Sequence, residues 1–106
     1  MPSFVAISVS DLPPGTVREV IHNDRTYAVC NVEGAFFAVS GDCPHHNGPL
    51  GHGAIHGHQV VCPWHLWEFD VRTGRSDFAP DCVIATYPTH VDGGAVHITL
   101  PEPRGL

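Results

Sequence analysis

Two short motifs carry the cysteine and histidine residues of this sequence that are best suited to chemistry. The first is Cys43-Pro44-His45, and the second, after sixteen intervening residues, is Cys62-Pro63-Trp64-His65. Thiolates and imidazoles are ligands of transition metals, and each motif supplies one of each kind. The spacing therefore predicts a metal site formed by four side chains: Cys43, His45, Cys62 and His65.

The order of the ligands favours iron over zinc. Structural zinc sites with two cysteines and two histidines pair C-x2-4-C with H-x3-5-H, so like ligands are neighbours in sequence. Here each cysteine is followed by a histidine, which suits a two-iron two-sulfur cluster with two cysteines on one iron and two histidines on the other. A zinc-stabilised binding module is an alternative. A disulfide between Cys43 and Cys62 is another, but it leaves both histidines without a role.

The remaining histidines and cysteines are expected to have no part in this site. His46 could replace its neighbour His45 as a ligand, but the C-x-H spacing favours His45. We expect His46 to be a solvated loop side chain. The same interpretation applies to His52, His56 and His58. A second metal site among them lacks a helical histidine pair or an accompanying carboxylate. Cys30 and Cys82 are expected to be small buried hydrophobes within strands.

The elements that must position these motifs are mainly strands. Apolar and β-branched residues occur in short runs that end at turn residues, and no helical period persists over three turns. The expected strands are 4–9, 16–21, 26–32, 35–39, 58–61, 67–71, 83–91 and 95–100. The first four should form a meander. Residues 40–57 are rich in Gly, Pro and His and predict a long functional loop.

Length and charge limit the possible partners. A chain of 106 residues predicts a single domain, 1–106, with one modest core. Five basic and eleven acidic residues give a net charge of −6, which argues against binding to nucleic acid or to anionic membranes. A basic protein surface is a better partner. We find no secretory signal and no run of membrane-spanning length, so we expect a cytoplasmic protein.

The segments CPHHNGPLGHG (43–53) and CPWHLWEFDVRTG (62–74) resemble the two cluster-binding loops of the Rieske family. The chain is most similar to the short ferredoxins of bacterial ring-hydroxylating oxygenases, with the small subunit of assimilatory nitrite reductase as a relative. The resemblance implies an all-β Rieske fold, with an antiparallel β-sandwich base and an inserted cluster-binding subdomain at 41–80. It also implies one two-iron two-sulfur (2Fe-2S) cluster.

The function implied by the resemblance is one-electron transfer by a carrier that is not itself an enzyme. The carrier would be a monomer that takes electrons from a flavin-dependent reductase and delivers them to a terminal oxygenase. No glycine-rich dinucleotide fingerprint follows a strand, so the chain should not oxidise a nicotinamide alone. The alternative within the family is a subunit of nitrite reductase.

Five positions bear on the properties of the cluster. The residue after the second ligand histidine is usually Gly in the family but is Leu66 here. Leu66 must adopt a negative φ or be held at a cost of about 1 kcal/mol or more. Respiratory Rieske proteins add a disulfide at positions matching Gly48 and Trp64, and hydroxyl donors at positions matching Trp67 and Phe69. Because these features are missing, we expect a reduction potential near the low end of roughly −150 to +300 mV.

Overall fold

The computed structural model describes residues 2–43, 48–64, 66–76 and 82–101, and it confirms the all-β prediction. The strands are β1 (Ser3–Ser8), β2 (Thr16–His22), β3 (Arg25–Val32), β4 (Ala35–Ser40), β5 (Ala54–His56), β6 (Gln59–Val61), β7 (Glu68–Asp70), β8 (Thr86–Tyr87), β9 (Thr89–Asp92) and β10 (Ala95–Thr99). Two short 3-10 helices complete the described elements: η1 (Val9–Asp11) and η2 (Leu50–His52). No helix in this described part is long and apolar enough to cross a membrane.

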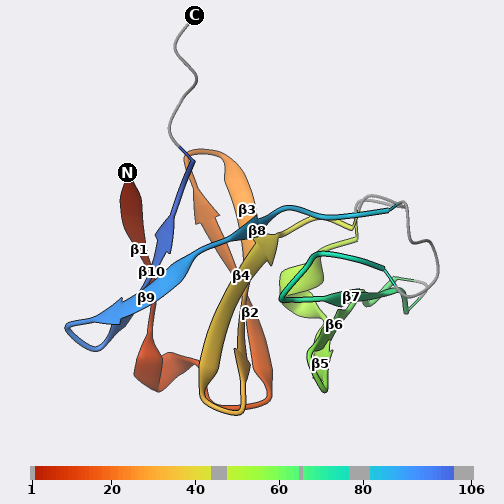
Figure 1. Cartoon of the computed structure of the whole chain (residues 1–106), viewed down its shortest axis with the longest axis horizontal. Coiled ribbons are helices and arrows are strands. Elements are labelled where there is room, and N and C mark those ends of the chain that lie inside the picture. Colours follow the sequence, from red (N-terminus) through yellow and green to blue (C-terminus); the bar gives the residue numbers. More distant parts are fainter. Residues whose placement is uncertain (1, 44–47, 65, 77–81, 102–106) are drawn as a thin grey trace, which may run out of the picture.

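The strands form three antiparallel sheets. Their orders are β1-β10-β9, β2-β3-β4-β8 and β5-β6-β7. Figure 1 shows the small sheet β5-β6-β7 beside the four-stranded sheet, on the side away from β1 and β10. This small sheet lies within the segment 41–80 that was predicted to bind the cluster.

Strand β3 separates the two cores of the molecule. Tyr27 and Val29 face the first core, which the β1-β10-β9 sheet covers with Val96 and Ile98. Alternate residues, beginning with Ala28, face the second core, which contains side chains of the small sheet. A strand that is buried on both faces needs apolar residues at nearly every position, and this explains the continuous apolar run in β3.

The hairpin turns lie where the sequence predicts them. Asn23 and Asp24 have φ angles of 50° and 64°, and Gly93 and Gly94 have φ angles of 60° and 77°. Two successive residues with positive φ form the type I′ turn that matches the twist of a two-residue hairpin. Gly and Asn tolerate this backbone better than other residues, so the turn residues themselves predict these two hairpins.

The expected four-stranded meander was wrong in its first strand. β1 pairs with β10, in a register that places Phe4 opposite Ile98, and it does not pair with β2. Of these four strands, β2, β3 and β4 form a meander. The connection 9–15 holds a 3-10 turn and two prolines, so it is not a tight hairpin, and β1 can join a different sheet.

Two other strand predictions need correction. The expected strand 83–91 is divided at Pro88: β8 pairs with β4, whereas β9 pairs with β10. Proline has no N–H to donate, so the ladder ends there and the chain changes sheets. Part of the expected loop 40–57 is strand β5, in which Ala54 pairs with Val61. Three residues between Gly53 and Gly57 are too few to show an alternating pattern.

Candidate metal centre

The two cysteine motifs lie in loops that are closed in the same way. The N–H of Cys43 donates to the carbonyl of Gly48 at 2.8 Å, and the N–H of Cys62 donates to the carbonyl of Trp67 at 2.7 Å. Each bond therefore joins a cysteine to the fifth residue after it. The first loop leaves β4 and leads to η2, and the second connects β6 to β7. Cys43 and Cys62 are thus held close to the ends of paired strands.

The structure brings the two cysteine sulfurs together in the core. Cys43 is 1 % exposed and Cys62 is fully buried, and their side chains are hydrogen-bonded to each other. Burial raises the pKa of the Cys62 thiol, the backbone N–H of Trp64 lowers it by hydrogen bonding to the sulfur, and Cys43 raises it again. Two adjacent thiols with a positioned N–H donor fit a site for iron, which would displace both protons. All four cysteines are free thiols, so the disulfide alternative has no support.

The predicted histidine ligands lie outside the described residues. This applies to His45, to His65 and to the competing ligand His46. Their role stays a prediction from the motif spacing. The described residues that flank these histidines lie in the two closed loops. Cys43 and Gly48 flank His45 in the first loop, and Trp64 and Leu66 flank His65 in the second.

Gly48 is required by the close approach of the two loops. A Cβ atom placed on Gly48 would lie 2.5 Å from Cys62 Sγ and 3.3 Å from Trp64 Cβ. The first distance is shorter than real contacts allow, so a side chain here would displace the sulfur or the loop. The second distance is close to the Cβ–Cβ separation of a disulfide. The two loops thus lie in contact at Gly48, Cys62 and Trp64, and the match of Gly48 and Trp64 to the disulfide positions of respiratory Rieske proteins stays a prediction.

Phe69 and Trp67 also lie near the cysteines. Phe69 is fully buried in the same core cluster as Cys43 and Cys62. Trp67 is half-buried against that cluster, with its ring centroid 6.4 Å from that of Phe69. Neither side chain carries a hydroxyl, and Phe69 presents only hydrocarbon to its surroundings. These two positions therefore supply no O–H donor to a neighbouring sulfur.

Leu66 adopts the strained alternative of the two that the sequence left open. Its φ is +57°, and its side chain is 65 % exposed. The other non-glycine residues with positive φ in the described chain occupy hairpin turns, namely Asn23, Asp24 and Glu33. A branched side chain in the left-handed region raises the free energy of the folded state. Because Leu66 is mostly exposed, the burial of its side chain does not offset this cost.

The predictions for the remaining cysteines are half correct. Cys30 is fully buried in β3, and burial raises the pKa of its thiol to about 12, so it stays protonated and inert at neutral pH. Cys82 was expected within a buried strand, but it is half-buried and lies outside the strands of the described chain. Cys82 precedes even the expected strand 83–91, and β8 begins only at Thr86, so Cys82 lies in the connection before it.

The described loop histidines, His52, His56 and His58, are exposed as predicted, but two of them have carboxylate neighbours that the sequence did not reveal. His52 Nε2 lies 3.3 Å from Glu19 Oε1, and His56 Nδ1 lies 3.0 Å from Glu68 Oε1. Each carboxylate is at least twelve positions away in the chain, so no local pattern could indicate it. Among the described residues no three metal-ligating side chains group together, and a second metal site has no support there.

Comparison with known proteins identifies the family. The model of the Rieske [2Fe-2S] domain matches residues 3–88. The chain is 37% identical over 90 residues to the biphenyl dioxygenase ferredoxin subunit of Pseudomonas sp. (strain KKS102), covering 83% of each chain. It is 35% identical over 106 residues to the 3-phenylpropionate/cinnamic acid dioxygenase ferredoxin subunit of Escherichia coli (strain K12), covering 98% of this chain and 99% of the relative.

Solved structures agree with this result. The Sphingomonas yanoikuyae B1 ferredoxin superposes with a TM-score of 0.83 at 31% identity, covering 94% of this chain and all of that one. A nitrite reductase small subunit from Mycobacterium tuberculosis, described as putative and NADH-dependent, has a TM-score of 0.87, covering 96% of this chain and 97% of that one. At 19% identity that likeness shows the fold alone.

The chain belongs to the Rieske [2Fe-2S] family. It is a Rieske-type ferredoxin with one 2Fe-2S cluster, an electron-transfer component and not a catalyst.

Proposed function

We propose that this ferredoxin carries single electrons from a flavin-dependent reductase to the terminal oxygenase of a dioxygenase system. The observation that carries the proposal is the pair of buried cysteine thiols, Cys43 and Cys62, which lie side by side in two closed loops. The relatives at 35% and 37% identity are ferredoxin subunits of dioxygenases. A structure described as a complex of reduced oxygenase and oxidized ferredoxin in carbazole 1,9a-dioxygenase includes a chain that matches at 30% identity with a TM-score of 0.82, over 91% of both chains.

The proposed ligands are the four residues of the two motifs. Cys43 and Cys62 would bind one iron, and His45 and His65 would bind the other, as in Rieske centres. The cluster supplies a one-electron couple when bound. The chain contributes the buried environment of the two thiolates and the Trp64 N–H that donates to the Cys62 sulfur. Such outer hydrogen bonds hold ligands in place and tune the metal.

The proposed reduction potential lies near the low end of the roughly −150 to +300 mV span of these centres. Three features support a low value. Phe69 and Trp67 offer no hydroxyl, Gly48 and Trp64 form no disulfide, and the net charge of −6 disfavours an added electron. A low potential suits a carrier that accepts electrons from a flavin.

The partners would bind transiently. Electron-transfer encounters use small interfaces, and an acidic carrier is attracted to a basic partner surface. We propose a monomer that works in the cytoplasm. The counts of five basic and eleven acidic residues make complementary charge the simplest source of fast association, which should weaken as salt rises.

The test of the ligand assignment is the visible spectrum of purified protein together with its iron and acid-labile sulfide content. Cys43→Ser and Cys62→Ser should lose the cluster, because each removes a thiolate that the chain does not replace. Cys30→Ala is the matched control and should retain it. A red-brown Cys43→Ser protein beside a colourless Cys30→Ala protein would show that the ligand assignment is wrong, and a colourless zinc-containing wild type would favour the binding module.

The electron path needs a separate test. Purified ferredoxin, reduced by a flavin-dependent reductase, should be reoxidised by a dioxygenase terminal component in the presence of that enzyme's aromatic substrate. Co-purification with a large haem-containing reductase, and no turnover with any oxygenase, would instead support the nitrite reductase alternative.

A further inference from the structure

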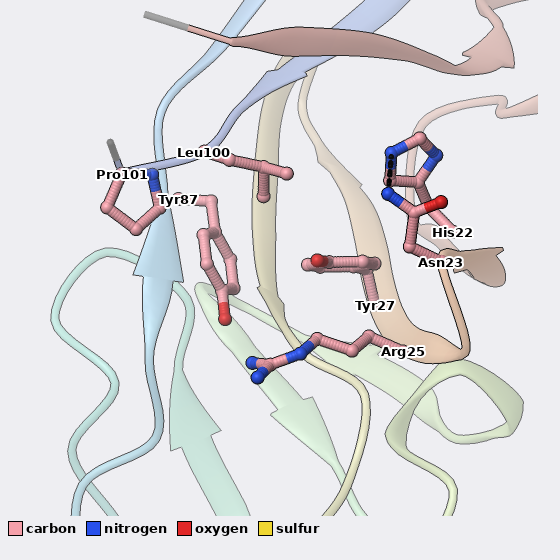
Figure 2. A pocket seen from close by; sticks show the side chains of 7 residues that line it. All are labelled: His22, Asn23, Arg25, Tyr27, Tyr87, Leu100 and Pro101. Atoms are coloured by element: carbon pink, nitrogen blue, oxygen red, sulfur yellow. Dashed lines mark hydrogen bonds between the residues drawn. The ribbon is translucent and has the colours of Figure 1, made fainter. Parts of the chain in front are cut away.

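A cavity of about 340 Å³ lies beside the hairpin that connects β2 and β3. Figure 2 shows its lining, which comes from this hairpin, from β8 and from the chain after β10. None of the described residues of the two cysteine loops lines it. The residues used below are His22, Arg25, Tyr27, Tyr87, Leu100 and Pro101. Its volume is within the range of small-molecule sites.

Two tyrosines provide hydroxyl groups to this cavity. Tyr27 is only 3 % exposed, and its hydroxyl makes no hydrogen bond within the described residues. Figure 2 shows that this hydroxyl points into the cavity toward Tyr87. The two rings meet edge to face, with centroids 5.2 Å apart. Tyr87 likewise lacks a hydrogen-bond partner for its hydroxyl among these residues. The Tyr27 hydroxyl is therefore open to the cavity, where it can hydrogen-bond to water or to a ligand.

Arg25 brings a positive charge to the same place. Its guanidinium lies on the side of the cavity where the Tyr87 hydroxyl points (Figure 2). Across the described chain, this guanidinium takes part in no ion pair and no hydrogen bond. Burial raises the pKa of Tyr87, and the nearby charge of Arg25 acts against that rise. An unpaired guanidinium next to two phenols forms a set of donors for an oxyanion.

The opposite side of the cavity is apolar. Leu100 and Pro101 face the polar groups, and the ring faces of Tyr27 and Tyr87 complete the wall (Figure 2). At the edge, His22 is held in place by stacking on Phe4, with ring centroids 3.8 Å apart. This arrangement suits a ligand with one charged end and one apolar body.

Nearby acidic groups limit the charge of the ligand. An adjoining cavity shares Arg25, Tyr27 and Tyr87 and is also lined by Asp24 and Asp42. These carboxylates would repel a dianion such as phosphate more strongly than a monoanion. A single carboxylate is therefore the better match for the one guanidinium.

We propose that this cavity binds a small monocarboxylate with an apolar body. The carboxylate accepts hydrogen bonds from Arg25 and from the Tyr27 hydroxyl, and the body lies against Leu100 and the Tyr87 ring. The site is independent of the function proposed above, since none of its residues belongs to the cluster loops.

The test uses the oxidised, cluster-containing protein labelled with nitrogen-15 and titrated with benzoate. Saturable chemical-shift changes should appear at the amides of the cavity residues. Benzyl alcohol is the neutral probe of similar shape and should bind at least about tenfold more weakly, because it lacks the charge-assisted hydrogen bond. Inorganic phosphate tests whether the apolar body matters, and it should also bind more weakly than benzoate.

Two variants and a matched control locate the site. Arg25→Gln should weaken benzoate binding about tenfold or more, and Tyr27→Phe should weaken it several-fold. Arg18→Gln makes the same change in net charge at an exposed position of β2 outside this cavity and should leave binding unchanged. The visible spectrum verifies that each variant is folded. The proposal is overturned by an absence of saturable benzoate binding, by equal weakening in both arginine variants, or by benzyl alcohol or phosphate binding as tightly as benzoate.

Discussion

Replacing Leu66 tests the backbone strain in the loop that begins at Cys62 and leads into β7. Leu66 has a φ of +57° and a side chain that is 65 % exposed. Leu66→Ala removes most of the side chain but keeps a Cβ in the left-handed region. Leu66→Gly removes the same contacts and also the Cβ. The difference between the two variants therefore isolates the strain.

The magnitude follows from three contributions. Full burial of a leucine stabilises by about 1.5–3 kcal/mol, so the one-third of Leu66 that is covered contributes about 0.5–1 kcal/mol, which both variants lose. Leu66→Gly alone also removes the strain of a Cβ in the left-handed region, which stabilises the folded state by about 1–2 kcal/mol. The greater freedom of glycine in the unfolded chain costs about 0.4–1 kcal/mol. We expect Leu66→Gly to be more stable than Leu66→Ala by about 0.5–1 kcal/mol.

The assay is thermal loss of the cluster's visible absorbance at one fixed heating rate. The expected difference moves the midpoint by about 2–8 °C for a chain of this size. Ile21 is the matched control, because it is 67 % exposed and lies in extended strand β2. There the order should reverse, with Ile21→Gly less stable than Ile21→Ala. If glycine is the less stable replacement at both positions, Leu66 is not strained and the reasoning fails.

Three further predictions concern the ligands, the potential and pH. His45→Ala should lose or deform the cluster and His46→Ala should keep it; a rhombic Rieske-type paramagnetic resonance signal found only in His45→Ala would move the ligand by one residue. Phe69→Tyr should raise the potential by roughly 60 mV, since a sulfur hydrogen bond worth about 1.5 kcal/mol favours the reduced cluster; unchanged film voltammetry at full iron content would mean that Phe69 does not face the cluster. Hydrogen bonds from Arg72 lower the pKa of Asp70, so Asp70 stabilises the fold above the usual carboxyl range and loses this effect as pH falls through the lowered pKa. The stability deficit of Asp70→Asn should therefore shrink below about pH 4, and a deficit constant with pH in denaturant titrations would refute this.

Local features of the sequence were enough to predict the hairpins. Asn23-Asp24, Glu33-Gly34 and Gly93-Gly94 all adopt positive φ at the turns where the pattern predicted them. A two-residue turn depends on the backbone preferences of the turn residues themselves, and these are encoded over a few positions. The same reasoning predicted the bounds of β2, β3 and β4 to within one residue.

The pairing of β1 could not be predicted in this way. Its partner β10 lies about ninety positions away, and the sequence between them contains several strands of similar apolar character. The choice depends on which arrangement buries the most apolar surface in the whole molecule. Phe4 and Ile7 pack on the core that Val96 and Ile98 share with β3. The apolar surface buried by the whole molecule cannot be read from any short segment of the sequence.

The sequence by itself determined the family of this ferredoxin, and its motif spacing predicts the two cysteine and two histidine ligands of one cluster. Tertiary structure decided how the chain presents that chemistry. It buried the Cys43 and Cys62 sulfurs side by side and left Leu66 with a positive φ. It also brought Arg25 to Tyr87, sixty-two positions later, around one cavity. Ligand type and spacing are properties of short segments, whereas burial, strain and long-range contact depend on the packing of all the sheets together.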